Sequence, residues 1–134
     1  MRDDPPAFDQ GGRWSRSDWW GVVLDAPDVA VLTQFYSELR GWKVWRQDAD
    51  GAALDLGEGV GYLAIQHNPN YVRPTWPATA GQQQMMLHMD FQVTDLEKSV
   101  ARALNLGAEL PAHQPQDDVR VLLDPAGHPF CLYT

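Results

Sequence analysis

Three polar side chains alternate along one short stretch of this 134-residue chain: His88, Asp90 and Gln92. Alternate residues of a β-strand point to the same face, so the spacing predicts that all three share one surface. Residues two apart lie about 7 Å apart, which suits a shared ligand or water better than a close ion pair. Imidazole exchanges protons near neutral pH, so His88 could act as a general acid–base that Asp90 orients. The alternatives are that the pair recognises a ligand, which we favour, or only satisfies structural neighbours.

The residues between these polar positions are apolar. Met89, Phe91 and Val93 form the opposite face of the same predicted strand, as in a sheet that packs one face against a helix. A similar alternation occurs near the start of the chain, where one face carries Val22 and Leu24 and the other carries Gly21, Val23 and Asp25.

Strands and helices are predicted from β-branched and aromatic runs, helix caps and turn residues. Asp28 and Asp95 are expected to cap two helices, and Gly41 and Gly107 to end them. The strand candidates of the first half are Trp20–Asp25, Trp42–Gln47, Ala52–Leu56 and Val60–Gln66. Those of the second half are Leu87–Val93, Ala108–His113, Val119–Leu123 and Phe130–Tyr133.

The two halves repeat one unit. Residues 24–29 (Leu-Asp-Ala-Pro-Asp-Val) match residues 91–96 (Phe-Gln-Val-Thr-Asp-Leu). Each half has the order strand, helix and three strands, so the sequence predicts an α+β fold of two βαβββ repeats. We expect their strands to form a curved mixed sheet with an open cup, and the helices to lie on the outer face.

The domain organisation follows from the same pattern. Residues 1–18 are polar, contain proline and glycine, and are predicted to form a flexible N-terminal arm. Residues 19–134 form a single domain, with a first module at 19–66, a loop at 67–84 and a second module at 85–134. The loop is long for a compact domain, so it is either a plain linker or a lid whose aromatic residues close over a ligand.

The repeats and several short motifs together resemble the vicinal oxygen chelate superfamily, the group of glyoxalase I, bleomycin-resistance proteins and extradiol dioxygenases. The resemblance covers about residues 20–133 and is greatest to bacterial glyoxalase-like domain proteins. It depends on the paired repeats and on four motifs, which are Phe35-Tyr36 with Leu39, Gly41-Trp42, residues 88–95 and residues 124–132. It implies the glyoxalase/bleomycin resistance/dioxygenase fold and a homodimer.

In metal-using members of this superfamily, ligands come from inward positions on the first, fourth, fifth and eighth strands. By resemblance, His88 occupies the position on the fifth strand, Gly21 that on the first and Cys131 that on the eighth. On the fourth strand the inward residue is either Ala64 or Gln66. A zinc-, nickel- or iron-type site needs at least three protein ligands, usually histidine and carboxylate. We therefore expect no metal and no other cofactor, with a divalent metal as the weaker alternative.

Six tryptophans are many for one small domain, and each offers a large flat surface to a core, an interface or an aromatic ligand. We predict an aromatic box at the cup, with Trp76 of the loop as one wall, and we expect Trp45 to face the cup or a dimer partner. The predicted ligand-binding residues are Trp20, Asp25, Tyr62, Gln66, Trp76, His88, Asp90, Gln92, Cys131 and Tyr133.

Two further features are predicted to be structural. Residues 124–127 have the proline and glycine positions of a β-turn, and His128 is expected to be exposed after it. Cys131 is expected to be an inert packing residue, because no basic neighbour is evident to activate its thiol.

Composition excludes several classes of protein. Eighteen acidic residues against ten basic ones give a formal net charge of -8, and the basic residues are scattered, which disfavours nucleic-acid binding. No apolar run approaches the roughly 20 residues of a membrane helix, and no signal peptide is evident. The single cysteine cannot form an internal disulfide. These features predict a cytoplasmic protein with no membrane partner.

The leading prediction is a small-molecule binding protein of the glyoxalase/bleomycin-resistance type, which holds an organic ligand, for example an aromatic one, in the cup without a catalytic metal. The first alternative is a metal-independent isomerase, lyase or cyclase that uses His88 and Asp90 as acid–base groups. The second is a divalent-metal-dependent enzyme that resembles glyoxalases or dioxygenases.

Overall fold

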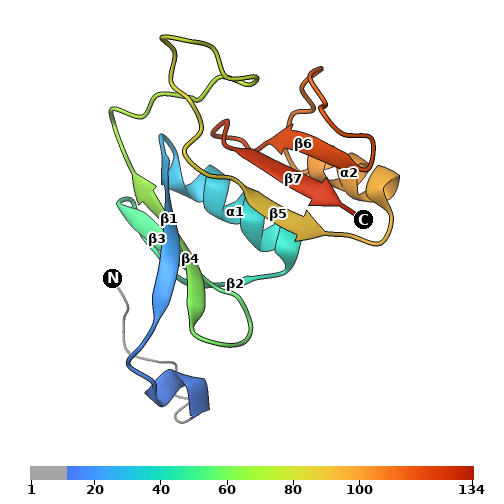
Figure 1. The fold of residues 1–134 in the computed structure, drawn as a ribbon. Coiled ribbons are helices and arrows are strands. Elements are labelled where there is room, and N and C mark those ends of the chain that lie inside the picture. The colour runs from blue at the N-terminus through green and yellow to red at the C-terminus, as the bar shows by residue number, and fades with distance from the viewer. Residues whose placement is uncertain (1–11) are drawn as a thin grey trace. The chain divides into compact units, whose positions relative to one another are not determined.

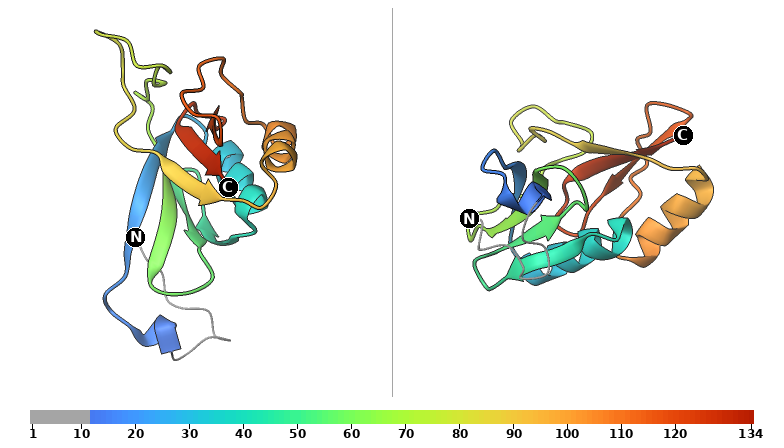
Figure 2. Two further views of the ribbon diagram at one scale, coloured as in Figure 1. Left: turned by 45° about the vertical axis from the view of Figure 1, so that its right-hand side comes forward. Right: turned by 90° about the horizontal axis from the view of Figure 1, so that it is seen from below.

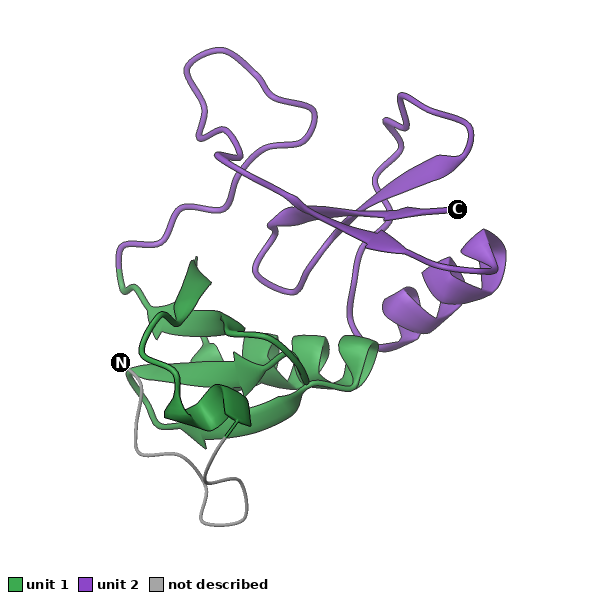
Figure 3. Cartoon of the chain, turned by 60° about the horizontal axis from the view of Figure 1, so that its bottom comes forward, with its two compact units in different colours: residues 1–69 green, residues 70–134 purple. Residues whose placement is uncertain are grey.

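The computed structural model describes residues 12–134 and places them in two compact units, which Figure 3 colours separately. Unit 1 extends to Pro69 and unit 2 is Asn70–Thr134. Each unit has one small mixed β-sheet and one α-helix (Figure 1), so the predicted α+β class is confirmed. Within residues 12–134, no helix is long and apolar enough to cross a membrane. The joining of the two sheets into one cup stays a prediction.

Unit 1 has the predicted βαβββ order. Its sheet has the strand order β1-β4-β3-β2, in which β1 is parallel to β4 and the other pairs are antiparallel. The elements are β1 (Trp20–Ala26), α1 (Val29–Arg40), β2 (Lys43–Gln47), β3 (Gly51–Asp55) and β4 (Gly61–His67).

Helix α1 begins and ends at the predicted residues. The Asp28 carboxylate accepts a hydrogen bond from the backbone N–H of Val31 (3.2 Å), a cap that stabilises a helix by about 1 kcal/mol. Gly41 follows the helix in a left-handed conformation (φ 71°), which glycine adopts without strain. The helix contacts β2, β3 and β4, and its buried residues are Val29, Leu32, Thr33, Phe35 and Tyr36.

Unit 2 contains three strands in the order β5-β7-β6, with β5 parallel and β6 antiparallel to β7. Asp95 caps its helix, because the Asp95 carboxylate accepts from the backbone N–H of Lys98 (3.1 Å). Figure 2 shows each helix lying along strands of its own unit, and α2 contacts β6 and β7. The elements are β5 (Met89–Gln92), α2 (Leu96–Asn105), β6 (Val119–Leu123) and β7 (Pro129–Tyr133).

One predicted strand of unit 2, Ala108–His113, is wrong. Within the described chain this stretch forms a single isolated bridge, between Glu109 and Leu123. Pro111 lies in the middle of the stretch and has no N–H to donate, so a continuous ladder cannot pass through it. The second repeat is therefore shorter than the first by one strand.

The predicted N-terminal arm, residues 1–18, is described only from Gly12 onward. Residues 1–11 lie outside the described residues, whereas Gly12–Ser15 form a short 3₁₀-helix, η1. Trp14 of this helix is only 5% exposed and contacts the rings of Trp19 and Trp45. Trp14 is thus anchored, because two further tryptophans contact its indole, whereas residues 15–18 are exposed.

Candidate functional site

The polar residues of β5 lie on the face opposite the buried Phe91. Phe91, between them in sequence, is buried and packs against Phe130 of β7, with ring centroids 6.2 Å apart. His88, Asp90 and Gln92 are all exposed. The alternation read from the sequence therefore describes this strand correctly: one side is core and the other is a polar surface open to solvent.

His88 and Asp90 are in direct contact, which corrects the predicted spacing. The Nε2 atom of His88 lies 3.1 Å from Oδ1 of Asp90. Side chains of a strand lean along its direction, and His88 precedes Met89, the first residue of β5, so the two groups approach more closely than their backbone positions suggest. Both side chains are more than a third exposed, so the pair is available to a molecule from solution.

Strand β7 adds two side chains to the same face. In the parallel pairing of β5 and β7, Cys131 lies beside Asp90 and Tyr133 beside Gln92. Burial, and then the charge and hydrogen bonding of Asp90, raise the pKa of the Cys131 thiol to about 11. A thiol that stays protonated is a poor nucleophile, so this side chain fits a passive role in the surface.

Together these residues form the polar face of unit 2, which we define as His88, Asp90, Gln92, Cys131 and Tyr133. It offers an imidazole, a carboxylate, an amide and a phenol within two neighbouring strands. Such a set can donate and accept hydrogen bonds to an organic molecule. The His88–Asp90 pair can also transfer a proton, because the carboxylate holds one ring nitrogen and leaves the other available.

In unit 1, the position that corresponds to His88 is Gly21, where Tyr62 leaves no room for a side chain. Gly21 lies beside Tyr62 in the parallel pairing of β1 and β4. A Cβ atom on residue 21 would overlap the Tyr62 ring and would lie 2.6 Å from the Tyr62 carbonyl oxygen. No larger side chain fits there without a shift of the backbone, so this position of the first repeat has no donor group to offer.

The register of β4 is now defined. Ala64 pairs with Val23 and Gln66 pairs with Asp25, so both candidate residues share the face of Gly21 but lie further along the strands. Asp25 accepts a hydrogen bond from the side-chain amide of Asn68 (3.1 Å). Gln66 is exposed and lines a small cavity of about 160 Å³ whose other walls include Arg46, Gly51 and Ala64.

Comparison with protein families decides the relationship. The family described as "Glyoxalase-like domain" matches residues 21–133, most of the chain. The chain belongs to this glyoxalase-like domain family. It is thereby a member of the vicinal oxygen chelate superfamily, as the sequence motifs predict. No curated protein matches the sequence.

Solved structures agree with this fold. A glyoxalase family protein from Enterococcus faecalis is 22% identical, with a TM-score of 0.58 over 90% of this chain and 98% of that one. A glyoxalase/bleomycin resistance protein/dioxygenase family enzyme from Burkholderia phytofirmans PsJN is 20% identical, with a TM-score of 0.62 over 84% and 94%. The fosfomycin resistance protein FosX from Mesorhizobium loti is 14% identical, with a TM-score of 0.63 over 89% and 92%. Identities this low show the shared fold and nothing of the ligand.

The glyoxalase-like domain does not carry a donor set that fits the superfamily's four-strand metal site. His88, Asp90 and Cys131 have donor atoms within 4.8 Å of one another. A metal held by all three would use the Cys131 thiolate, and its binding would release the thiol proton. In the first repeat, Gly21 has no side chain and the neighbouring Tyr62 is a phenol. The three donors are therefore a local group within unit 2.

Two aromatic residues of the predicted box, Trp20 and Trp76, are placed by the structure within their own units. Trp20 alternates with Gly21 on β1, so it belongs to the opposite face of the strand, where it is 65% exposed. The Trp76 Nε1–H donates to the carbonyl of His113 (3.1 Å), and the two rings are 5.7 Å apart. The loop aromatics thus pack on their own unit.

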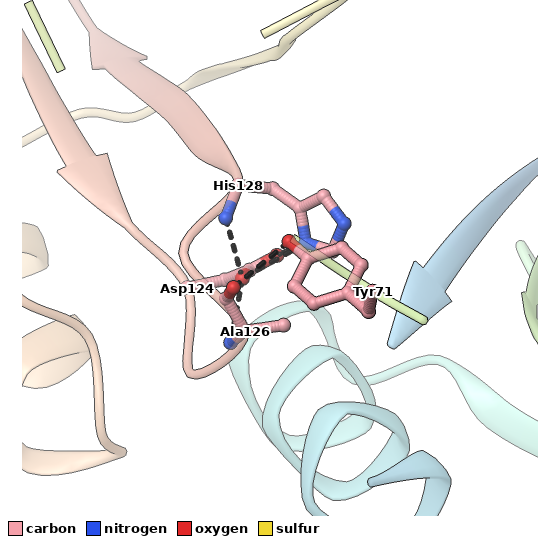
Figure 4. Close-up of polar contacts among 4 residues, drawn as sticks. All are labelled: Tyr71, Asp124, Ala126 and His128. Carbon is pink, nitrogen blue, oxygen red and sulfur yellow. Dashed lines mark hydrogen bonds and ion pairs between the residues drawn. The ribbon is translucent and has the colours of Figure 1, made fainter. Parts of the chain in front are cut away.

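A second polar cluster, missed by the sequence reading, surrounds the turn before β7 (Figure 4). The Asp124 carboxylate is fully buried and accepts from the backbone N–H groups of Ala126 (2.9 Å) and His128 (3.0 Å). Its Oδ2 atom lies 2.8 Å from Nδ1 of His128. His128 is therefore largely buried and held in place, rather than exposed. The sequence Asp-Pro-Ala-Gly-His indicates this cluster, because an aspartate at the start of a turn accepts hydrogen bonds from the backbone N–H groups that follow it.

The beginning of the long loop is attached to this turn. The Tyr71 hydroxyl donates to the carbonyl of Ala126 (2.8 Å), and its ring lies 5.4 Å from the His128 ring. Arg73 packs over Gly127 and forms an ion pair with Glu109 (3.1 Å). The loop is thus fixed at its start by side chains of unit 2.

Proposed function

We propose that this glyoxalase-like domain binds a small organic molecule on the polar face of unit 2, without a catalytic metal. The observation that carries the proposal is the His88–Asp90 pair, whose atoms are 3.1 Å apart while both side chains remain open to solvent. Exposed pairs of this kind contribute little to stability, generally less than about 1 kcal/mol. A binding role is the stronger explanation for a paired imidazole and carboxylate beside an amide and a phenol.

The metal-free part of the proposal rests on donor chemistry. The group of His88, Asp90 and Cys131 contains one thiol whose pKa is raised to about 11. Metal binding has to displace the proton of this thiol, which lowers the affinity of the group for a divalent ion at neutral pH. Hydrogen bonding to an organic ligand needs no such deprotonation.

A ligand screen with matched variants tests this function. Fragments that bind the purified chain are found by ligand-observed NMR and then titrated against His88→Ala and Asp90→Asn. We expect each variant to bind the hits at least tenfold more weakly, which corresponds to about 1.4 kcal/mol. Asp118→Asn is the control. It changes an exposed carboxylate between α2 and β6 and should leave the affinity unchanged. Equal affinity in all four proteins would contradict the proposal.

The same His88–Asp90 pair supports one alternative, a metal-independent isomerase, lyase or cyclase. In that case His88 moves a proton on the ligand and Asp90 holds its ring. NMR of a bound hit after long incubation separates the two functions. An unchanged ligand supports binding alone, whereas a converted product that disappears with His88→Ala supports the enzyme.

We also propose a cytoplasmic homodimer. Its support is the exposed indole of Trp20 at the start of β1, an edge strand of its sheet, because exposed aromatic groups at strand edges favour association. Light scattering should give twice the mass of one chain. A single-chain mass at micromolar concentration would contradict the dimer.

A further inference from the structure

The segment before the matched family region occupies a surface of unit 1 with its own side chains. Arg13 and Trp14 of η1 contact residues of β2, of the end of β3 and of the turn that follows. We propose that these two side chains fill a binding site for a cationic aromatic molecule. The proposal is independent of the function proposed for unit 2, because all the residues involved belong to unit 1.

The cation end of this site is built from two oxygen acceptors. Arg13 donates from Nη2 to Oδ1 of Asp55 (2.5 Å) and from Nη1 to the carbonyl of Gly59 (3.2 Å). The two charged side chains are each less than a fifth exposed. The backbone N–H of Gly57 also donates to the Asp55 carboxylate (2.9 Å), which holds this acceptor in place whatever cation faces it.

The aromatic end is a cluster of three indoles, in which Trp19 and Trp45 also contact each other, with ring centroids 5.8 Å apart. Trp14 meets Trp45 edge to face at 4.9 Å between centroids and lies tilted against Trp19 at 5.1 Å. The Arg13 guanidinium lies 4.9 Å from the Trp14 ring and 5.5 Å from the Trp19 ring. This is the arrangement in which aromatic faces attract a cation, worth about 0.5–2 kcal/mol per contact.

Two walls of the site, Trp45 and Asp55, belong to the sheet rather than to the segment that fills it. Trp45 belongs to β2, and Asp55 ends β3. Trp19 directly precedes β1, whose first residue, Trp20, donates its N–H to the carbonyl of Val60 (3.0 Å). Asp55 also pairs with Tyr62, so it lies on the same face of the sheet as Gly21. Because the sheet fixes Trp45 and Asp55, a free molecule with the chemistry of Arg13 and Trp14 can take their place.

The ligand class follows from the walls: a flat ring of indole size that carries a positive charge. The carboxylate and carbonyl select a cation over an anion, and the net charge of -8 attracts cations to the chain. Tryptamine, an indole with an ammonium group, is the probe, and indole-3-propionate is its matched anion. Both are titrated by isothermal calorimetry into the full chain and into the double variant Arg13→Ser/Trp14→Ser, which empties the site.

We expect tryptamine to bind the double variant at least tenfold more tightly than it binds the full chain. Tryptamine should also bind the double variant at least tenfold more tightly than indole-3-propionate does. Adding Asp55→Asn should remove this preference for the cation. Absence of saturable tryptamine binding to a folded double variant, or equal binding of the two probes, would overturn the proposal. Neither result bears on the polar face of unit 2, which is tested with His88 and Asp90 variants.

A second measurement does not depend on the folding of the double variant. Arg13→Ser alone keeps the Trp14 indole and removes the cation, and millimolar methylguanidinium should then restore at least half of the lost melting temperature. Arg120→Ser is the control, because Arg120 belongs to unit 2, where its guanidinium donates to the carbonyls of Gln116, Asp117 and Val119. Equal response of the two variants to methylguanidinium would overturn the cation site.

Discussion

Tyr62 lies beside Gly21 in the parallel pairing of β1 and β4, and its ring covers the place where a side chain of residue 21 would begin. This contact separates the two repeats chemically. The second repeat presents His88 at the corresponding position, whereas the first presents no side chain. The two repeats are therefore asymmetric at this position, where only the second offers a hydrogen-bonding side chain.

Replacing Gly21 by histidine, so that the first repeat matches the second, should destabilise the fold. Gly21→His places a large side chain where even a Cβ lies 2.6 Å from the Tyr62 carbonyl oxygen, so we expect a loss of about 2 kcal/mol in the free energy of unfolding. Urea denaturation measures the change. Gly61→His, next to Tyr62 on β4 and with its Cβ position 3.6 Å from Leu56, is the matched variant and should lose less. Unaltered stability in Gly21→His would show that the ring moves aside freely.

The buried Asp124 should be important for stability. Asp124→Asn keeps one oxygen acceptor for the backbone N–H groups of Ala126 and His128 but removes the charge beside the His128 ring, so we expect a loss of about 2–3 kcal/mol. Thermal and urea unfolding provide the measurement. Asp18→Asn, which breaks an exposed pair with Arg16, should cost less than about 0.5 kcal/mol. Similar losses in the two variants would contradict the structural role of the turn.

Gly127 should tolerate no side chain. It has a φ of 94°, and a Cβ there would overlap Arg73 and lie 2.8 Å from its Nε atom. Gly127→Ala therefore combines backbone strain with displacement of Arg73, and we expect about 2–3 kcal/mol of destabilisation. Gly59→Ala carries the strain without the clash, because nothing lies within 4 Å of its Cβ position (φ 69°). The difference between the two variants in urea measures the Arg73 contact, and a difference of zero would argue that this contact is negligible.

Because of the Cys131 thiol, we expect the free energy of unfolding to decrease at alkaline pH. Its pKa is about 11 in the folded chain against an ordinary value of 9.0, because of burial first and Asp90 second. Between these values the folded chain holds more protons than the unfolded chain, so stability is present below pH 9 and falls as the pH rises toward 11. The residue is partly exposed, and we therefore expect about 1 kcal/mol.

Other groups titrate in the same alkaline range, so the comparison is with Cys131→Ser, which should lack this part of the decrease. Asp90→Asn should lower the pKa of the thiol and speed its alkylation by iodoacetamide, though burial keeps it above the ordinary value. Identical pH profiles for the original chain and Cys131→Ser would refute the effect.

Much of the fold could be predicted because local signals and tertiary packing agree. Asp28, Asp95 and Gly41 are strong helix boundaries, and the alternation of His88 to Gln92 defines both faces of β5. The predicted strand Ala108–His113 is absent as a strand because the pairing of a segment depends on its neighbours, which the sequence pattern alone does not give. Pro111 was the residue in the sequence that argued against this strand, because proline has no N–H to donate to a neighbouring strand.

The candidate site was less predictable, since contacts between distant residues decide it. The closure of Gly21 by Tyr62 follows from a strand register that the sequence leaves open. The burial of Trp14 depends on Trp45, thirty-one positions away in the chain, so the sequence pattern around Trp14 does not reveal it. The His128 contact with Asp124 was closer at hand, because the turn sequence itself brings the two side chains together.

The central claim is that the polar face of unit 2 binds its ligand without a metal, and metal analysis of the purified chain tests it most directly. The protein is prepared without chelator and without affinity nickel, and mass spectrometry measures bound metals in the original chain and in His88→Ala. The account predicts no stoichiometric metal in either protein. One metal ion per chain that disappears in His88→Ala would contradict it and would assign His88, Asp90 and Cys131 to a metal centre.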